Sequence, residues 1–195
     1  MVNADRGEYM QIRNNGMRFG TVAHVLHWGM FAVFIALFVS AEIMQDLPKG
    51  EERWALYGFH KSLGVTALFL VFLRLSWRGL NPLPEGSGNN PAWQRSLAAA
   101  VHLLLYVVML VMPLSGYVMS VAHGYGIEWF GLWELPDLVG KDEALAEQAK
   151  QLHIYSSYGL YALVGIHAGA AMWHQFVLKD GIMQRMLSVK NPLTD

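Results

Sequence analysis

Four long apolar runs constrain this chain more than any other feature of its sequence. They cover about residues 22–42, 58–78, 97–121 and 153–178. Each approaches the roughly 20 residues that a helix needs to cross ~30 Å of hydrocarbon. Because backbone polar groups must be satisfied internally there, the runs predict transmembrane helices. We expect one all-α membrane domain over residues 1–195, built as a bundle of four transmembrane helices.

The composition excludes several other classes of protein. The 195 residues are 54% hydrophobic and 15% charged, whereas soluble domains carry about 25% charged residues. This hydrophobicity excludes a disordered chain, and 14 Lys and Arg against 15 Asp and Glu exclude the basic footprint of a nucleic-acid binder. Cysteine is absent, so any metal must be held by other side chains, of which His and Met are the candidates.

The linkers and their charges predict how the chain is oriented. Of the 14 Lys and Arg residues, nine lie on the side that holds both termini and the second linker, and five on the other side. By the positive-inside rule, we expect both termini to be cytoplasmic. Residues 133–150 form a polar linker on the outer side, with a short amphipathic helix expected over Asp142–Lys150. Val39–Ala41 resembles a signal-peptide cleavage site, but the length of its run favours an uncleaved span.

Histidines inside the apolar runs are the strongest functional signal, because ionisable side chains are costly in a span. His153 and His167 are 14 residues apart in the fourth run, so they share a helix face and are separated by about 21 Å. The direction of each run places His60 at the depth of His153 and His27 at the depth of His167. The sequence therefore predicts two bis-histidine sites, stacked across a helix bundle.

Two facing imidazoles suit heme iron better than zinc. Zinc takes four protein ligands, or three and a water, whereas heme supplies four iron ligands itself and needs only axial groups. Helix bundles build such sites in their cores, and Gly64, Gly165 and Gly169 leave room for a heme. Arg74, 14 residues after His60 and on the same face, is a candidate partner for a heme propionate.

Other interpretations of these residues stay open. A histidine in a span can be an interhelical hydrogen-bonding group, Gly165–Gly169 can be a packing motif, and Arg74 can extend to the cytoplasmic surface. His24 can replace His27 as a ligand, although we expect it at the lipid headgroups. His102 lies at about the depth of His27 and can compete for the inner heme, bond a propionate or contact a quinone.

Several stretches together resemble the bacterial cytochrome b561 family, which is related to the cytochrome b subunits of nickel–iron hydrogenases. They are RFGTVAHVLHWGMF, GFHKSLGVTALFLVFLRL, AVHLLLYVVMLVMPLSGYVMS and LHIYSSYGLYALVGIHAGAAMWHQFVLKDGIMQRM, and they span nearly the whole chain from about Arg18. The resemblance implies four helices in the bacterial inner membrane, two b hemes, and ubiquinone chemistry near the cytoplasmic leaflet. It assigns His27 and His167 to the inner heme, and His60 and His153 to the outer heme.

The resemblance also places Trp28, Arg74 and His174 near the quinone end. His174 lies seven residues beyond His167 on the same face, where it can donate a hydrogen bond and relay a proton. Trp28 offers an indole N–H and an aromatic wall, and Arg74 or Arg78 can hold a propionate or a negatively charged quinone. The function that we expect is electron transfer between membrane quinone and a periplasmic donor, either superoxide or a redox protein.

The sequence leaves the protein's status as an enzyme open. It can be a superoxide:ubiquinone oxidoreductase in its own right, although the acidic outer side disfavours an anionic substrate. It can instead be the heme-bearing membrane anchor of a larger periplasmic dehydrogenase or hydrogenase. A histidine-based proton or metal transporter is a third possibility, but the chain lacks the internal repeat that transporters usually show.

Overall fold

A computed structural model describes residues 11–84 and 90–187 of the chain. It contains four long helices, α1 (Thr21–Asp46), α2 (Glu51–Leu80), α3 (Ala92–Ala122) and α4 (Glu143–Trp173). The antiparallel strands β1 (Glu128–Trp129) and β2 (Trp133–Glu134) lie between α3 and α4 in the sequence. A π-helical turn η1 (His174–Leu178) and the short helix α5 (Gln184–Leu187) follow α4.

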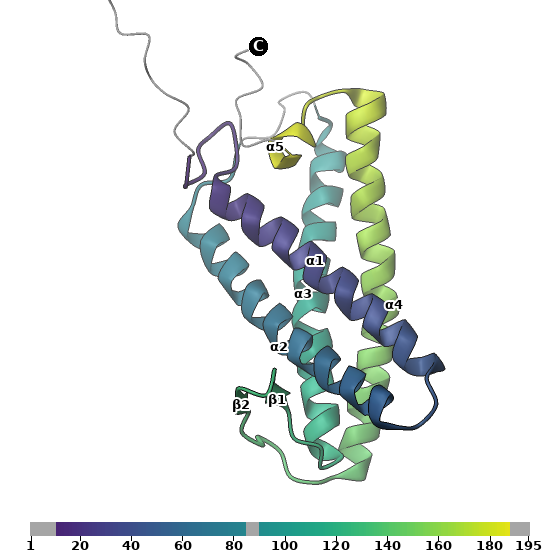
Figure 1. The fold of residues 1–195 in the computed structure, drawn as a ribbon. Helices are drawn as coiled ribbons and strands as arrows, with labels where there is room; N and C mark the ends of the chain where they lie inside the picture. Colours follow the sequence, from purple (N-terminus) through teal and green to yellow (C-terminus); the bar gives the residue numbers. More distant parts are fainter. Residues whose placement is uncertain (1–10, 85–89, 188–195) are drawn as a thin grey trace, which may run out of the picture.

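The long helices form two antiparallel pairs that cross obliquely (Figure 1). α1 packs against α2, α3 packs against α4, and α2 joins the two pairs through α3. The start of α1 and the end of α4 lie at the same end of the molecule, together with α5 (Figure 1). We call this the terminal end, and the opposite end, where β1 and β2 lie, the hairpin end.

The predicted helical membrane architecture is confirmed for three of the four helices. Among the described residues, α1, α2 and α3 are long and apolar enough to cross a membrane. α4 is as long as α3, but its apolar stretch contains tyrosines, glycines and two histidines, which lower its mean hydropathy. A fourth span along α4 and a cytoplasmic location for the termini stay predictions. Two of the Lys and Arg residues counted for this orientation, Arg6 and Lys190, lie outside the described residues.

The helices begin earlier than their apolar runs. α2 starts at Glu51 and α3 at Ala92, several residues before the predicted starts. The separate amphipathic helix expected over residues 142–150 is wrong, because this segment continues without a break into α4. The Asp142 carboxylate accepts a hydrogen bond from the Leu145 N–H at 3.0 Å. This N-cap satisfies a backbone donor that the first helical turn would otherwise leave free, so α4 can start in polar sequence.

The apolar core fills the middle of the bundle. Its buried members come from all four long helices: Met30, Phe34, Leu37, Leu63, Ala67, Val71, Leu105, Met112 and Leu160. On α4, Leu160 lies midway between His153 and His167. The core therefore separates one level of histidines near the hairpin end from another near the terminal end.

Candidate functional site

His60 of α2 and His153 of α4 face each other toward the hairpin end. Their ring centres are 6.4 Å apart and their planes are nearly perpendicular, at 79°. His153 Nδ1 lies 2.8 Å from the Met112 carbonyl oxygen, which can only accept, so the ring carries its proton on Nδ1. His60 Nδ1 lies 2.8 Å from the Ser40 hydroxyl, which itself donates to the Leu37 carbonyl and so accepts from His60. Both rings therefore keep a lone pair on Nε2.

α3 provides a closely fitted surface for His153. A Cβ atom added to Gly116 would lie 3.0 Å from both Cε1 and Nδ1 of the His153 ring, closer than ordinary van der Waals contact. Glycine at this position lets the imidazole approach the helix and reach the Met112 carbonyl one turn earlier. This role of Gly116 was not predicted from the sequence. Its signal is the Pro-x-x-Gly spacing from Pro113, the residue after Met112.

His27 of α1 and His167 of α4 form a second pair toward the terminal end. Their ring centres are 6.2 Å apart, with 69° between the planes. His102 of α3 also approaches His167, with ring centres 5.3 Å apart. Arg74 donates to His27 Nδ1 at 2.9 Å and to the Tyr106 hydroxyl at 3.1 Å. The structure thus gathers the residues predicted for the inner site and adds Tyr106 to them.

The contact between Arg74 and His27 fixes the position of the imidazole proton. A guanidinium only donates, so His27 Nδ1 accepts and the proton of the neutral ring lies on Nε2. A metal bound through Nε2 needs the other tautomer. Metal binding at this pair therefore requires Arg74 to release His27 Nδ1, and this release leaves the guanidinium free for an anionic partner.

The ring separations match one metal ion between two imidazoles. A metal about 2 Å from each of two facing ring nitrogens sets the ring centres about 6 Å apart. The separations of 6.4 Å for His60 with His153 and 6.2 Å for His27 with His167 fit this value. The 5.3 Å between His102 and His167 is shorter than two ligands on opposite sides of one metal would give. Each level therefore offers two facing ligands, which suits a metal whose remaining ligands come from a prosthetic group such as heme.

The packing of the helices also leaves space for a flat group. α4 packs closely on α3 but has no comparable packing, over the described residues, with α1 or α2, which carry its partner histidines. A Cβ atom at Gly64, one turn after His60, would meet nothing within 4 Å. Gly165 and Gly169 are exposed, so the open space around them lies outside the bundle and is not room for a heme. The donor set and the packing at both levels fit a bis-histidine heme.

The two residues predicted near the quinone have partners in the segment after α4. His174, the first residue of η1, places Nδ1 2.6 Å from the Asp180 carboxylate. The Trp28 indole N–H donates to the Met186 carbonyl at 2.9 Å, so this predicted quinone donor is already engaged. Burial raises the pKa of Asp180, but hydrogen bonds from His174 and the Ile182 N–H outweigh it and hold the pKa below its ordinary value. The sequence analysis missed Asp180, whose signal is the Lys-Asp that follows α4.

His24 is buried within the protein, with 5% of its surface exposed. Its expected depth at the lipid headgroups stays a prediction. Its Nδ1 lies 2.9 Å from the Gly20 carbonyl, beneath the segment that runs from Gln11 to the start of α1. Arg78, the other candidate cation, places its guanidinium 5.9 Å from the centre of the Tyr106 ring.

Comparison with known proteins gives a consistent result along nearly the whole chain. The family model described as prokaryotic cytochrome b561 matches residues 18–189. Cytochrome b561 homolog 2 of Escherichia coli (strain K12) is 29% identical over 185 residues, covering 91% of this chain and 95% of that protein. Cytochrome b561 homolog 1 of the same organism is 30% identical over 173 residues, covering 87% and 97%. "Probable superoxide oxidase CybB" of Yersinia pestis is 27% identical over 165 residues, covering 85% and 93%.

The match includes all four long helices and both histidine levels. The family implies a b-type heme in a membrane cytochrome, in agreement with the paired imidazoles and with the three helices that can cross a bilayer. The resemblance noted in the sequence is therefore confirmed: the chain belongs to the prokaryotic cytochrome b561 family.

Proposed function

We propose that this protein is a di-heme cytochrome of the inner membrane that carries electrons from the periplasmic face to ubiquinone, with superoxide as the donor. The observation that most supports it is the presence of two histidine pairs, with ring centres 6.2 and 6.4 Å apart, at two levels of one bundle. α4 is the fourth span, and the terminal end is cytoplasmic because Lys and Arg concentrate there. The donor is suggested by the relative named "Probable superoxide oxidase CybB".

In this proposal, His60 and His153 hold the outer heme, and His27 and His167 hold the inner heme. Bound heme b supplies reversible one-electron chemistry. The protein's part is to hold each imidazole in one orientation and tautomer. Met112 does this for His153 through its carbonyl oxygen, at 2.8 Å from Nδ1. Arg74 is assigned to a propionate of the inner heme, after it has released His27.

The terminal end supplies the protons that quinone reduction needs. Two superoxide ions give one electron each and become two molecules of O₂, while one quinone takes both electrons and two protons to become quinol. His174 can hold and pass a proton at Nε2, because its Nδ1 is fixed by Asp180. Trp28 lines the site through its half-exposed ring, since its N–H is bonded to Met186.

The proposal is tested on the purified protein in lipid vesicles. A pyridine hemochrome assay should find two hemes per chain, superoxide should reduce them, and a soluble ubiquinone analogue should reoxidise them. Superoxide dismutase removes the donor and is the control for the reduction step. One heme or none would contradict the paired sites. Reduction that needs a periplasmic partner protein would instead identify a membrane anchor of a larger dehydrogenase or hydrogenase.

Gly116→Ala should weaken the outer heme without removing its ligands. The new methyl group lies 3.0 Å from the His153 ring, so it displaces the imidazole from the Met112 carbonyl. Loss of such a supporting hydrogen bond typically lowers metal affinity about 10–100-fold, and we expect about tenfold here. The measurement is the transfer of heme to apomyoglobin, followed separately for the two hemes. Gly79→Ala is the matched control, since a Cβ there meets nothing within 4 Å; equal transfer rates in both variants would contradict the prediction.

A further inference from the structure

We propose that the β1–β2 hairpin is a lipid-binding wedge that lies in the outer leaflet of the membrane, against α2. It is the chain between α3 and α4, and its second strand begins the segment that the sequence presents as a polar linker. The proposal goes beyond electron transfer. It rests on α2 as a membrane span with the hairpin end facing the periplasm, and it does not depend on the hemes.

Hydrogen bonds hold the hairpin against one side of α2. Lys61 Nζ donates to the Gly126 carbonyl at 2.7 Å, just before β1. The Ser62 hydroxyl lies 3.0 Å from the Glu128 carbonyl oxygen and accepts the Phe130 N–H at 3.0 Å. Consecutive residues of α2 thus bind the backbone at both ends of the first strand, so the hairpin position is set by this helix.

These contacts place the hairpin beside the interior of α2 and not beyond its end. The Trp129 indole N–H donates to the Thr66 hydroxyl at 3.0 Å. Counted from Glu51, the first residue of α2, the contacts at Lys61 and Thr66 lie about 15 and 22 Å along the helix. Figure 1 shows the two strands alongside this part of α2. The hairpin is therefore at the level of His60, where a span has already entered its apolar run.

Much of the hairpin backbone is hydrogen-bonded within the protein, as an apolar surrounding favours. The strands pair Glu128 with Glu134 and Trp129 with Trp133. The Leu132 N–H donates to the Trp129 carbonyl at 3.0 Å and closes the turn. Together with the Ser62 and Lys61 contacts, these bonds lower the cost of placing the strands at the edge of the lipid.

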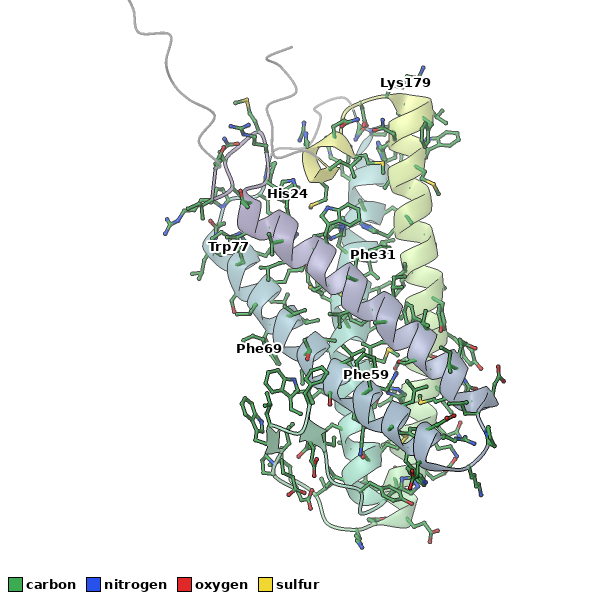
Figure 2. The ribbon with its side chains drawn as sticks, viewed as in Figure 1. His24, Phe31, Phe59, Phe69, Trp77 and Lys179 are labelled. Atoms are coloured by element: carbon green, nitrogen blue, oxygen red, sulfur yellow. The ribbon has the colours of Figure 1, made fainter. Side chains whose placement is uncertain are left out.

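The tip of the hairpin presents large apolar side chains to the outside. Leu132 is 69% exposed and Trp133 is 60% exposed, and the Phe130 ring is also exposed. The patch continues onto α2 through Phe59, whose ring centre is 6.3 Å from that of Phe130, and through the exposed Phe69. Figure 2 shows Phe59 and Phe69 on the part of α2 that borders the hairpin.

The backbone conformation of the turn indicates that the exposed ring of Phe130 contacts something outside the protein. Phe130 and Gly131 both adopt left-handed backbone angles, with φ of 50° and 69°. Glycine does this freely, whereas a bulky residue there is strained. The Phe130 ring is 45% exposed and contacts the Phe59 and Trp129 rings, neither of which belongs to the buried core, so packing within the fold offsets little of this strain.

Lipid is the occupant that best fits this surface. Tryptophan is enriched where membranes meet water, because one side of its ring is apolar and its N–H is polar. Glu128 and Glu134 are exposed and pair in register at the open end of the strands, where their charges favour contact with water. The hairpin thus has an aromatic tip and an acidic open end, and its apolar patch continues onto the side of α2. This arrangement matches the boundary between lipid headgroups and acyl chains.

Because the chain has no cysteine, single cysteines can report depth in the intact protein. Leu132→Cys carries a nitroxide label at the tip, and Leu138→Cys carries one in the exposed linker after β2 as the matched aqueous control. Phe69→Cys is the lipid-facing control. Each variant is reconstituted with its hemes in phosphatidylcholine vesicles, and the heme spectrum verifies folding. Label collisions with apolar oxygen and with a water-soluble nickel chelate are then compared.

We expect the oxygen-to-nickel collision ratio at Leu132→Cys to match Phe69→Cys and to exceed Leu138→Cys by about threefold or more. A ratio at Leu132→Cys equal to that at Leu138→Cys would overturn the proposal, and would assign the patch to a water-soluble partner instead. Trp133→Cys provides a second reporter on the same strand if the first variant fails to fold. Loss of quinone reduction with an unchanged collision ratio would contradict the proposed function and leave the wedge intact.

Discussion

His153→Ala should leave one heme bound where the proposed function places two. The substitution removes one of the two ligands proposed for the outer heme, and the facing His60 cannot hold a low-spin iron alone. The inner pair lies about 21 Å away along α4, beyond the apolar core, so it should keep its heme. His60→Ala should give the same result, whereas His27→Ala or His167→Ala should remove the inner heme and spare the outer one. The pyridine hemochrome assay counts the hemes, and the oxidised spectrum shows which one is left.

Two histidine controls make this result specific. His123→Ala changes an exposed histidine just after α3 and should leave both hemes in place. His102→Ala should also keep the inner heme, because its 5.3 Å ring separation from His167 is shorter than two opposed ligands of one iron would give. If His102→Ala abolishes the inner heme and His27→Ala does not, the ligand assignment at that level is wrong.

His174→Ala should slow reoxidation of the reduced cytochrome by a soluble quinone at least about tenfold, since positioned proton donors typically contribute 10²–10⁴-fold. The variant removes the imidazole that Asp180 holds at the terminal end, while its distance from His167 leaves the heme ligands unchanged. Stopped-flow absorbance in a variant with both hemes spectrally intact measures the rate. Gln175→Ala, the next position in η1, is the control. Wild-type rates in His174→Ala would remove this residue from the mechanism.

We propose that Asp180 positions the His174 ring. Asp180→Asn tests this because it removes the negative charge and keeps the shape of the side chain. Asp180→Asn should lower the rate at saturating quinone without changing the quinone concentration at half-maximal rate. The pKa of Asp180 lies below its ordinary value, so its contact with His174 is present at neutral pH. That contact stabilises the fold above the pKa of an unfolded aspartate, about 3.9, and is lost as the pH falls through the lowered folded pKa.

The histidine levels could be predicted from the sequence because they depend only on helical rise and chain direction. A rise of 1.5 Å per residue places His153 and His167 at two depths whatever the tilt of their helix. The partners of those rings depend instead on crossing geometry and rotamers. Ser40 and Gly116 show no periodic signal, and they lie beside the rings only because α1 packs on α2 and α3 packs on α4.

The hairpin and the start of α4 were missed for a different reason. Strands of two residues are too short to show an alternation of apolar and polar side chains. The aromatic residues around Trp129 are interpreted from the sequence as the boundary of a polar linker. The segment before His153 is polar, but its cap at Asp142 and its buried Ala146 and Ala149 make it one helix with the apolar run. Hydropathy indicates which part of a helix lies in the membrane, whereas the capping residue indicates where the helix begins.

The contact between Arg74 and His27 makes the two levels differ in charge. Toward the hairpin end, the Nδ1 atoms of His60 and His153 are bonded to neutral oxygens, the Ser40 hydroxyl and the Met112 carbonyl. Toward the terminal end, the Arg74 guanidinium donates to His27 Nδ1. The inner level therefore carries a fixed positive charge beside one of its imidazoles, whereas these partners of the outer rings are uncharged.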